Sequence, residues 1–331
     1  MSQAAIGVVG AGAWGTALAQ ALASDGRAVL LWALEDGLAD AINATRRNVL
    51  YLPSAELAPS IEATGDFVSM AKCDVLLIVT PAQHTASTLA KLPQYPRDLV
   101  LCSKGIEAST GRMMHVVAHD AAPASDIAVL SGPTFAHEVA AGLPCAVTLA
   151  CGGGEAQWER LAPAIARANF RPYYSDDVIG AEVGGAVKNV LAIACGVVDG
   201  LGLGQNARNA LITRGFAEML RFGVALGGQA ETLTGLCGLG DLVLTCSSTS
   251  SRNFSLGKAL GEGMSAAEAL ADKRTVAEGA HTAPVLRQLA HRHGVQMPIT
   301  EAVNDLLEGR PARRVVADLL ARPLKAEGLP R

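Results

Sequence analysis

One charged residue, Lys188, interrupts an apolar run that reads "EVGGAVKNVLAIACGVVDG" from residue 182 to 200. A lysine rarely becomes fully buried without a partner, because desolvation disfavours its charged form. On a helix, the residues that share its face are Gly184, Leu191, Ala192 and Cys195. None of these is a carboxylate. Lys188 is therefore either a lysine that reaches solvent from a buried helix or an acid–base group whose pKa burial lowers toward neutral pH.

A glycine triplet near the start of the chain predicts a nucleotide site. Gly10, Gly12 and Gly15 have G-x-G-x-x-G spacing between a β-like run and a helical pattern. The first glycine allows a tight turn, the second lets a pyrophosphate approach the backbone, and the third allows close helix–strand packing. A second β-like run, "AVLLW", follows. This context favours dinucleotide binding over a glycine-rich turn without a ligand.

The choice between NAD and NADP depends on the end of that second run. Glu35 lies 20 residues after Gly15, where an acid usually accepts hydrogen bonds from the adenosine ribose hydroxyls. A 2′-phosphate would instead need a basic residue, and the stretch "WALEDG" (32–37) has none. The sequence therefore favours NAD.

Four further stretches are polar where their surroundings are apolar: "SKGIE" (103–107), "SGPTFAHE" (131–138), "GLGDL" (238–242) and "SSRNF" (250–254). Lys104 and the segment from Ser131 to Thr134 each follow a β-like run. They should therefore lie at the carboxyl ends of strands, where ligands bind in open α/β sheets.

The last of these stretches places Ser251, Arg252 and Asn253 at the start of an expected helix. Free backbone N–H groups and an arginine at a helix start suit a phosphate. The ordinary alternatives are a serine that caps the helix and an arginine on the solvated surface.

The pattern of strand-like and helical segments that must position these residues predicts an α/β fold with two domains. Six near-continuous apolar runs of strand length alternate with helical patterns up to about residue 175, at 5–10, 28–32, 74–82, 98–105, 127–132 and 145–151. Such runs are typical of a doubly wound, Rossmann-type parallel sheet that is buried on both faces. The rest is rich in helical patterns, one of which opens with a capping box, Ser265-x-x-Glu268. We expect a dinucleotide-binding domain at 1–178 and an all-helical substrate-binding domain at 179–331.

The composition narrows the class of partner. The chain has 331 residues, a net charge of −4 and only 4% aromatic residues, which argues against nucleic acid as a partner. Its seven cysteines form no C-x-x-C pair and no Cys/His cluster with zinc spacing, so we expect reduced thiols and no metal. We see neither a secretory signal nor an uninterrupted membrane-spanning run. A cytoplasmic, non-membrane protein is expected.

The blocks named above, taken together, resemble those of the bacterial NAD(P)-dependent glycerol-3-phosphate dehydrogenases. The similar blocks occur in the family's order and cover nearly the whole chain. They are "GAGAWGTALA", "SKGIE", "SGPTFAHEVAAGLP", "EVGGAVKNVLAIACGVVDGLGLGQNARNALITRG", "GLGDLVLTCSSTSSRN" and "VAEG". The long block around Lys188 is far more specific than the glycine triplet.

The resemblance implies reversible reduction of dihydroxyacetone phosphate to sn-glycerol 3-phosphate with NAD or NADP as cofactor. It implies that Lys188 is the proton acceptor, with Lys104 and Asp241 beside it in catalysis. The implied substrate contacts are Lys104, Gly132, Thr134, Lys188, Asp241, Ser251, Arg252 and Asn253. With the glycine turn and Glu35 included, the cofactor contacts are Gly10, Gly12, Ala13, Trp14, Gly15, Leu34, Glu35, Lys104, Ala136, Arg252, Val276 and Glu278.

Two residues depart from the family pattern. Ala13 stands where a serine is common, and Leu34 stands where an arginine or histidine often lies beside the ribose. The second departure puts a preference for NADP in doubt, in agreement with Glu35.

Other functions stay open from the sequence alone. A two-domain dehydrogenase acting on a 3-hydroxy acid would have the same layout, although the Ser251-Arg252-Asn253 cluster suits a phosphate better. A nucleotide-sensing module that has lost its chemistry is the non-enzyme alternative, and the intact Lys104, Lys188 and Asp241 speak against it. The resemblance further implies a role in supplying glycerophospholipid synthesis, and a homodimer is one expected assembly.

Overall fold

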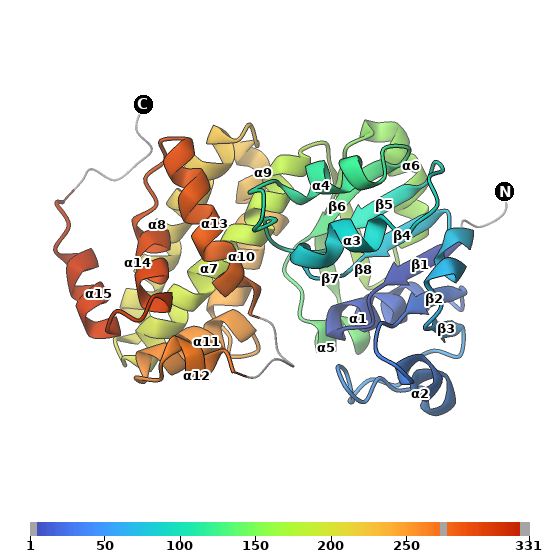
Figure 1. Cartoon of the computed structure of the whole chain (residues 1–331), viewed down its shortest axis with the longest axis horizontal. Helices are drawn as coiled ribbons and strands as arrows, with labels where there is room; N and C mark the ends of the chain where they lie inside the picture. Colours follow the sequence, from blue (N-terminus) through green and yellow to red (C-terminus); the bar gives the residue numbers. More distant parts are fainter. Residues whose placement is uncertain (1–4, 272–276, 325–331) are drawn as a thin grey trace. The chain divides into compact units, whose positions relative to one another are not determined.

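The computed structural model describes residues 5–271 and 277–324, which form two compact units (Figure 1). The first unit contains 5–103 and 112–178, and the second contains 104–111 together with the described residues from 179 onward. The division expected from the sequence placed 104–111 in the first domain. This segment packs with the second unit instead, because Lys104 forms an ion pair with Asp241.

The described part of the first unit contains a sheet of eight strands in the order β3-β2-β1-β4-β5-β6-β7-β8. Its strands are β1 (Ile6–Val9), β2 (Val29–Trp32), β3 (Ile61–Thr64), β4 (Val75–Ile78), β5 (Asp98–Leu101), β6 (Asp126–Ser131), β7 (Cys145–Cys151) and β8 (Phe170–Ser175). The β6–β7 pair is antiparallel and the other neighbouring pairs are parallel.

Each of the six β-like runs overlaps one of these strands, and the Rossmann-type sheet predicted from the sequence is confirmed. The sequence did not identify β3 and β8, which are the two edges of the sheet. Edge strands are only partly buried, as the exposed Glu62 in β3 illustrates. They therefore lack the continuous apolar run that identifies the central strands.

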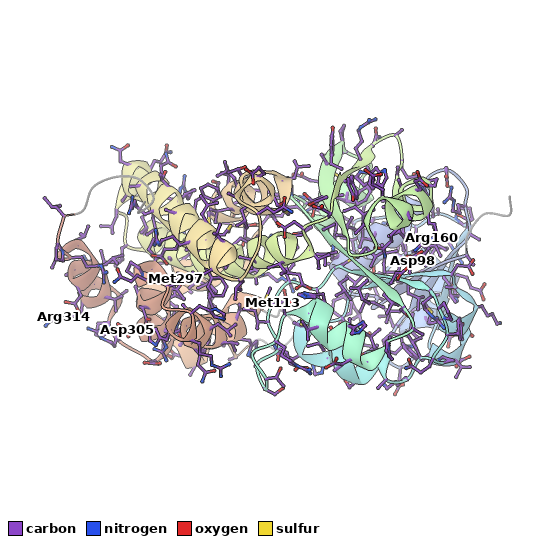
Figure 2. The ribbon with its side chains drawn as sticks, turned by 90° about the horizontal axis from the view of Figure 1, so that it is seen from above. Asp98, Met113, Arg160, Met297, Asp305 and Arg314 are labelled. Atoms are coloured by element: carbon purple, nitrogen blue, oxygen red, sulfur yellow. The ribbon has the colours of Figure 1, made fainter. Side chains whose placement is uncertain are left out.

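Helices cover both faces of this sheet. They are α1 (Ala13–Leu22), α2 (Leu38–Thr45), α3 (Thr85–Leu89), α4 (Met114–Ala121), α5 (Ala136–Ala140) and α6 (Gly154–Ile165), with short 3₁₀ turns η1 (Phe67–Lys72) and η2 (Ala82–His84). Leu77 joins the core cluster that α1 and α2 complete. Its neighbours Leu76 and Ile78 point to the opposite face and are equally buried. Figure 2 shows how a polar contact ties β5 to α6, where Arg160 and Asp98 form an ion pair of 3.0 Å.

The described part of the second unit is helical, as the sequence predicted. Its helices are α7 (Val178–Gly200), α8 (Gly204–Ala225), α9 (Ala230–Thr234), α10 (Asp241–Cys246), α11 (Arg252–Gly261), α12 (Ala266–Ala269), α13 (Glu278–Arg292), α14 (Pro298–Leu307) and α15 (Ala312–Leu320). A π-helical turn, η3 (Leu236–Gly240), precedes α10. The predicted capping box at Ser265 and Glu268 opens α12.

Helix α7 forms the core of this unit, and glycines let it pack closely against its neighbour α11. A Cβ on Gly196 would lie 2.0 Å from the carbonyl oxygen of Phe254, and one on Gly257 would lie 1.9 Å from that of Ile193. Helices α7 and α11 therefore approach more closely than any side chain at these two positions would allow.

Among the described helices, α7 has the length and apolar character of a membrane span, and 89% of its apolar window is buried inside the protein. The sequence analysis found no uninterrupted run of this length, and α7 does contain Glu182, Lys188 and Asp199, but its mean hydropathy still reaches that of a span. Burial on this scale is typical of a core helix.

Candidate active site

Lys188 and Asp241 form the centre of the site in the second unit. The ammonium Nζ of Lys188 donates to Oδ1 of Asp241 at 2.5 Å and to Oγ1 of Thr245 at 3.0 Å. Lys188 is 6% exposed and Asp241 is fully buried. The carboxylate that the face of α7 lacks therefore comes from α10, so Lys188 does not reach solvent.

The second oxygen of Asp241 binds a second ammonium. Lys104, from the segment 104–111, donates to Oδ2 of Asp241 at 2.7 Å. One carboxylate is thus shared between two lysines, and the negative charge of Glu278, at the start of α13, acts on Lys104 as well. Three residues that the sequence hypothesis grouped in catalysis are close together in the structure.

This arrangement gives the two lysines opposite pKa shifts. Desolvation lowers the pKa of Lys188 to about 7, helped by the charge of Lys104 and opposed by Asp241. Desolvation also acts to lower the pKa of Lys104, but the ion pair with Asp241 outweighs it, and the pKa of Lys104 is raised. Lys188 can therefore exchange a proton near neutral pH, while Lys104 stays a fixed positive charge.

Local structure explains how α10 presents these groups. Asp241 is the first residue of α10 and Thr245 lies one turn later, so both side chains share one face of the helix. The Thr245 hydroxyl also donates to Oδ1 of Asp241 at 3.3 Å. The π-helical turn η3 precedes them, and such turns are frequent at functional sites.

Asn253 joins α11 to the same region. Its Nδ2 donates to Oδ1 of Asn189, the residue next to Lys188, at 3.0 Å. Its Oδ1 accepts the backbone N–H of Gly279, next to Glu278, at 2.9 Å. Among the described residues the second N–H of the Asn253 amide has no partner, so this side chain has a structural role and can still bind substrate.

The other two residues of the predicted phosphate cluster differ from each other. Ser251 is buried and caps α11, because its Oγ accepts the N–H of Phe254 at 3.3 Å. Arg252 is the first residue of α11 and is exposed. Its guanidinium has no hydrogen bond or ion pair with the described residues, so it is available to an anion.

In the first unit, the glycine turn has the geometry that a pyrophosphate needs. Gly10 has φ +115°, and a Cβ on Gly15 would lie 1.8 Å from the Gly10 carbonyl oxygen. Gly12 is the N-cap of α1, so this position has no side chain that could cap the helix. A Cβ on Gly12 would meet nothing within 4 Å. The α1 N-terminus is therefore open to an anion.

Three further predicted cofactor residues lie on α1 and α5. Ala13 and Trp14 begin α1, and Ala136 begins α5, which packs against α1. The Trp14 Nε1 is buried and has no hydrogen-bond partner among the described residues. A buried donor without a partner is uncommon, so Trp14 is suited to donate to a bound group.

Glu35 and Leu34 follow β2, where the adenosine ribose is expected. Leu34 is 69% exposed, and Glu35 accepts a hydrogen bond of 2.5 Å from the hydroxyl of Tyr51. Arg46 is a base that could have met a 2′-phosphate. Its guanidinium donates to the carbonyl oxygens of Asn43 and Ile61 instead. The Arg46 guanidinium is thus already bound to backbone.

Gly132 and Thr134 follow β6, also in the first unit. A Cβ on Gly132 would lie 2.9 Å from the Cα of Val147, so close packing of β6 on β7 already requires a glycine here. Thr134 donates to the Gly132 carbonyl oxygen at 3.3 Å. Val276 lies outside the described residues.

Several residues with direct contacts in these sites were not identified from the sequence. Thr245 could have been found, since it lies four positions after Asp241 on the expected helix. Asn189 is a polar residue beside Lys188 in the same apolar run. Tyr51 gave no such signal, because its pairing with Glu35 depends on how the β2–β3 connection folds.

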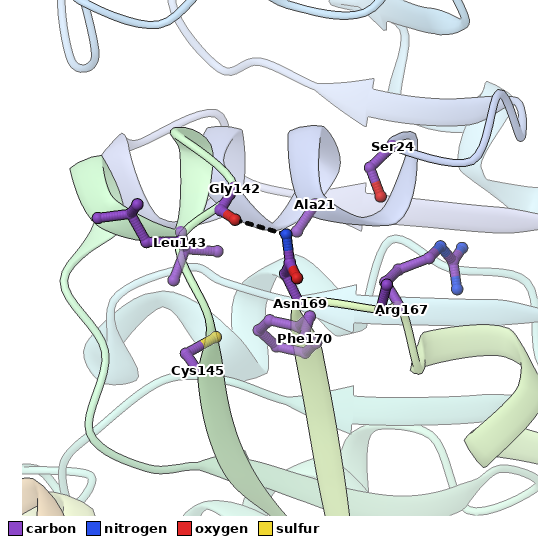
Figure 3. Close-up of a pocket in the computed structure, with 10 residues that line it drawn as sticks. Ala21, Ser24, Gly142, Leu143, Cys145, Arg167, Asn169 and Phe170 are labelled. Atoms are coloured by element: carbon purple, nitrogen blue, oxygen red, sulfur yellow. Dashed lines mark hydrogen bonds between the residues drawn. The ribbon is translucent and has the colours of Figure 1, made fainter.

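Two other features bear on what the protein could bind. No group of three or more His, Cys, Asp or Glu side chains that could hold a metal is found in the described parts of the chain. A cavity of about 220 Å³ lies in the first unit (Figure 3) and contains none of the predicted site residues. Asn169 and Arg167 in its lining each donate to a backbone carbonyl.

Comparison with known proteins identifies relatives along almost the whole chain. Residues 5–157 match the model of the NAD-dependent glycerol-3-phosphate dehydrogenase N-terminus, and residues 177–317 match that of its C-terminus. A glycerol-3-phosphate dehydrogenase [NAD(P)+] of Erythrobacter litoralis is 70% identical over 98% of both chains.

Two further relatives extend the comparison. The protein of the same name from Novosphingobium aromaticivorans is 71% identical over 97% of this chain and 98% of its own length. The crystal structure of glycerol-3-phosphate dehydrogenase from Coxiella burnetii has a TM-score of 0.92 at 40% identity, over 97% of this chain and 99% of that chain.

Proposed function

Because the chain belongs to the family of NAD-dependent glycerol-3-phosphate dehydrogenases, we propose that it reversibly reduces dihydroxyacetone phosphate to sn-glycerol 3-phosphate with NADH or NADPH. The observation that carries this proposal is the buried Lys188, whose pKa burial lowers to about 7 and which Asp241 holds in place. Family membership also favours the phosphorylated substrate over a 3-hydroxy acid, and catalysis over a nucleotide-sensing role.

Lys188 supplies the acid–base chemistry in this proposal, and Lys104 supplies a fixed charge. The nicotinamide cofactor, when bound, donates a hydride to C2 of the substrate or accepts one from it. The Lys188 ammonium then protonates the oxygen on C2 during reduction, and its neutral amine takes the hydroxyl proton during oxidation. A group of this kind contributes roughly 10²- to 10⁴-fold to the rate. The fixed charge of Lys104 stabilises negative charge that develops on the same oxygen.

The first turn of α11 is the proposed site for the substrate phosphate. Arg252 is exposed, and among the described residues its guanidinium and one N–H of Asn253 have no partner. A planar guanidinium can donate two parallel hydrogen bonds to a phosphate. Ser251 supports this turn as its cap.

The first unit supplies the proposed cofactor site. The open N-terminus of α1 at Gly12 suits the pyrophosphate, Trp14 offers a buried donor, and Glu35 suits the ribose hydroxyls. Leu34 and Glu35 in place of basic residues favour NADH. We therefore propose that NADH is used at least as well as NADPH.

Steady-state kinetics with dihydroxyacetone phosphate, using NADH and NADPH in parallel, test this proposal. Acetoacetate replaces the substrate in a second series, because it is the oxidised partner of a simple 3-hydroxy acid. Turnover of dihydroxyacetone phosphate and none of acetoacetate is expected. Turnover of acetoacetate alone would identify the alternative enzyme, and cofactor binding without any turnover would identify the sensing module.

We also propose, on the resemblance alone, that the protein is a cytoplasmic homodimer that supplies glycerophospholipid synthesis. Light scattering after size-exclusion chromatography gives the mass in solution, for comparison with 34.0 kDa for one chain. Cell fractionation tests the location.

A further inference from the structure

The Tyr51 side chain links two parts of the nucleotide-binding unit that are separate in sequence. Its hydroxyl donates to Oε1 of Glu35 at 2.5 Å. The pKa of Tyr51 is raised by this hydrogen bond, by burial and by the charge of Glu35. The hydroxyl therefore stays protonated and keeps donating at neutral pH. Since Tyr51 occupies Oε1, the other carboxylate oxygen, Oε2, is left as the principal acceptor for a ligand.

The segment that carries Tyr51 is itself fastened to the glycine turn. Asn48 is fully buried, and its Nδ2 donates to the Ala11 carbonyl oxygen at 2.7 Å and to Oγ1 of Thr16 at 2.8 Å. Its Oδ1 accepts the backbone N–H of Tyr51 at 3.2 Å. Asn48 thus ties the glycine turn to Tyr51, and Tyr51 ties both to Glu35.

We propose that Tyr51 determines cofactor specificity by positioning Glu35, with Asn48 fixing Tyr51 relative to the glycine turn. The inference rests on the proposed function only in taking a nicotinamide dinucleotide as the ligand. Tyr51 is a positioning residue, since it acts on the ribose through the carboxylate of Glu35.

The consequence of this positioning is a preference for NADH over NADPH. A carboxylate held in one orientation can accept a hydrogen bond from the ribose 2′-hydroxyl in NADH. The same fixed charge repels the 2′-phosphate of NADPH, because it is not free to turn away. If Tyr51 loses its hydroxyl, Glu35 can rotate, which weakens the binding of NADH and relieves the repulsion of NADPH.

A double-mutant cycle with Tyr51→Phe and Glu35→Gln tests this mechanism. The dissociation constants of NADH and NADPH are measured by fluorescence titration without substrate, so the readout is independent of turnover. In the wild-type background, Tyr51→Phe should lower the ratio of NADH to NADPH affinity by about three- to tenfold, the range expected for the net contribution of one typical hydrogen bond. In the Glu35→Gln background, Tyr51→Phe should leave the ratio within twofold.

A matched control is Tyr173→Phe, which removes a hydroxyl from an exposed tyrosine on β8 and should change neither affinity. A Tyr51→Phe effect of the same size in both backgrounds would overturn the inference, because Tyr51 would then touch the cofactor directly. An equal loss for both cofactors would also overturn it, as would no loss for either.

The proposed function fails by a different outcome. Absence of turnover with dihydroxyacetone phosphate, together with the expected affinity shift, would contradict the reaction and leave the role of Tyr51 intact. Normal turnover with an unchanged affinity ratio would support the reaction and contradict the role of Tyr51. A wild-type protein that binds neither cofactor would contradict both.

Discussion

Lys188 and Asp241 are 53 positions apart in the chain, yet Nζ of one lies 2.5 Å from Oδ1 of the other in the protein interior. The ion pair offsets the cost of burying the ammonium. The ion pair offsets this cost only in part, because desolvation still lowers the pKa of Lys188 to about 7. Asp241 therefore determines both how far the pKa of Lys188 is lowered and where its ammonium lies.

Replacing Asp241 by Asn should shift the pH dependence of the reaction. Asp241 raises the pKa of Lys188, so without its charge that pKa falls below about 7. Reduction needs the protonated ammonium, and the falling limb of kcat against pH should move to lower pH. The profile of kcat from pH 5 to 9 measures the shift, with thermal unfolding of both proteins as the control for folding. A falling limb at an unchanged pH would mean that Asp241 does not influence the titrating group.

Arg252→Lys should raise the KM for dihydroxyacetone phosphate strongly, by about tenfold or more, because a point charge replaces a planar fork. Unphosphorylated dihydroxyacetone, a poorer substrate, should show little change in kcat/KM. Arg313→Lys, on the exposed side of α15, is the matched control and should behave as wild type. Equal losses for both substrates would show that Arg252 does not bind the substrate phosphate.

Leu34→Arg should shift the cofactor preference toward NADPH. The new guanidinium would extend from an exposed position beside Glu35, where it can meet the 2′-phosphate. The ratio of kcat/KM for NADPH to that for NADH is the measurement, and we expect a rise of about tenfold. A wild-type preference for NADPH of tenfold or more would show that another base already binds this phosphate.

Glu218→Gln should change how stability depends on pH. Burial raises the pKa of Glu218 to about 7, although the N–H groups of Ile299 and Thr300 bind its carboxylate. A raised carboxyl pKa stabilises the fold fully below the ordinary value near 4.5. That contribution is lost as the pH rises through about 7.

The wild-type free energy of unfolding, measured with urea, should therefore fall relative to that of Glu218→Gln between about pH 4.5 and 7. Parallel curves for the two proteins across this range would mean that Glu218 is not the titrating group.

The central strands and the glycine turn could be predicted because their signals are local. Residues 75 to 79 are apolar throughout, as a strand buried on both faces requires, and Gly10, Gly12 and Gly15 are spaced for one turn. The edge strands β3 and β8 could not be predicted in this way, since a half-exposed strand mixes apolar and polar residues.

The active site could be predicted only in part, because many of its contacts join residues that are far apart in sequence. The face of α7 offers Lys188 no carboxylate, so helix periodicity could not supply its partner. Asp241 was expected beside it from the resemblance, and the structure brings that carboxylate from α10. Tyr51 and Asn48 act through contacts across 16 and 37 positions. Such contacts become visible only once the chain is folded.

The proposed role of Lys188 is tested most directly by the kcat of Lys188→Ala for the reduction of dihydroxyacetone phosphate at pH 7. NADH affinity, thermal unfolding and the variant Lys258→Ala, which changes a lysine paired with Asp199 on the surface, serve as controls. We predict a loss of at least about a hundredfold in kcat, with NADH still bound and Lys258→Ala active. A Lys188→Ala enzyme that turns over within a few-fold of wild type would contradict its assignment as the acid–base group.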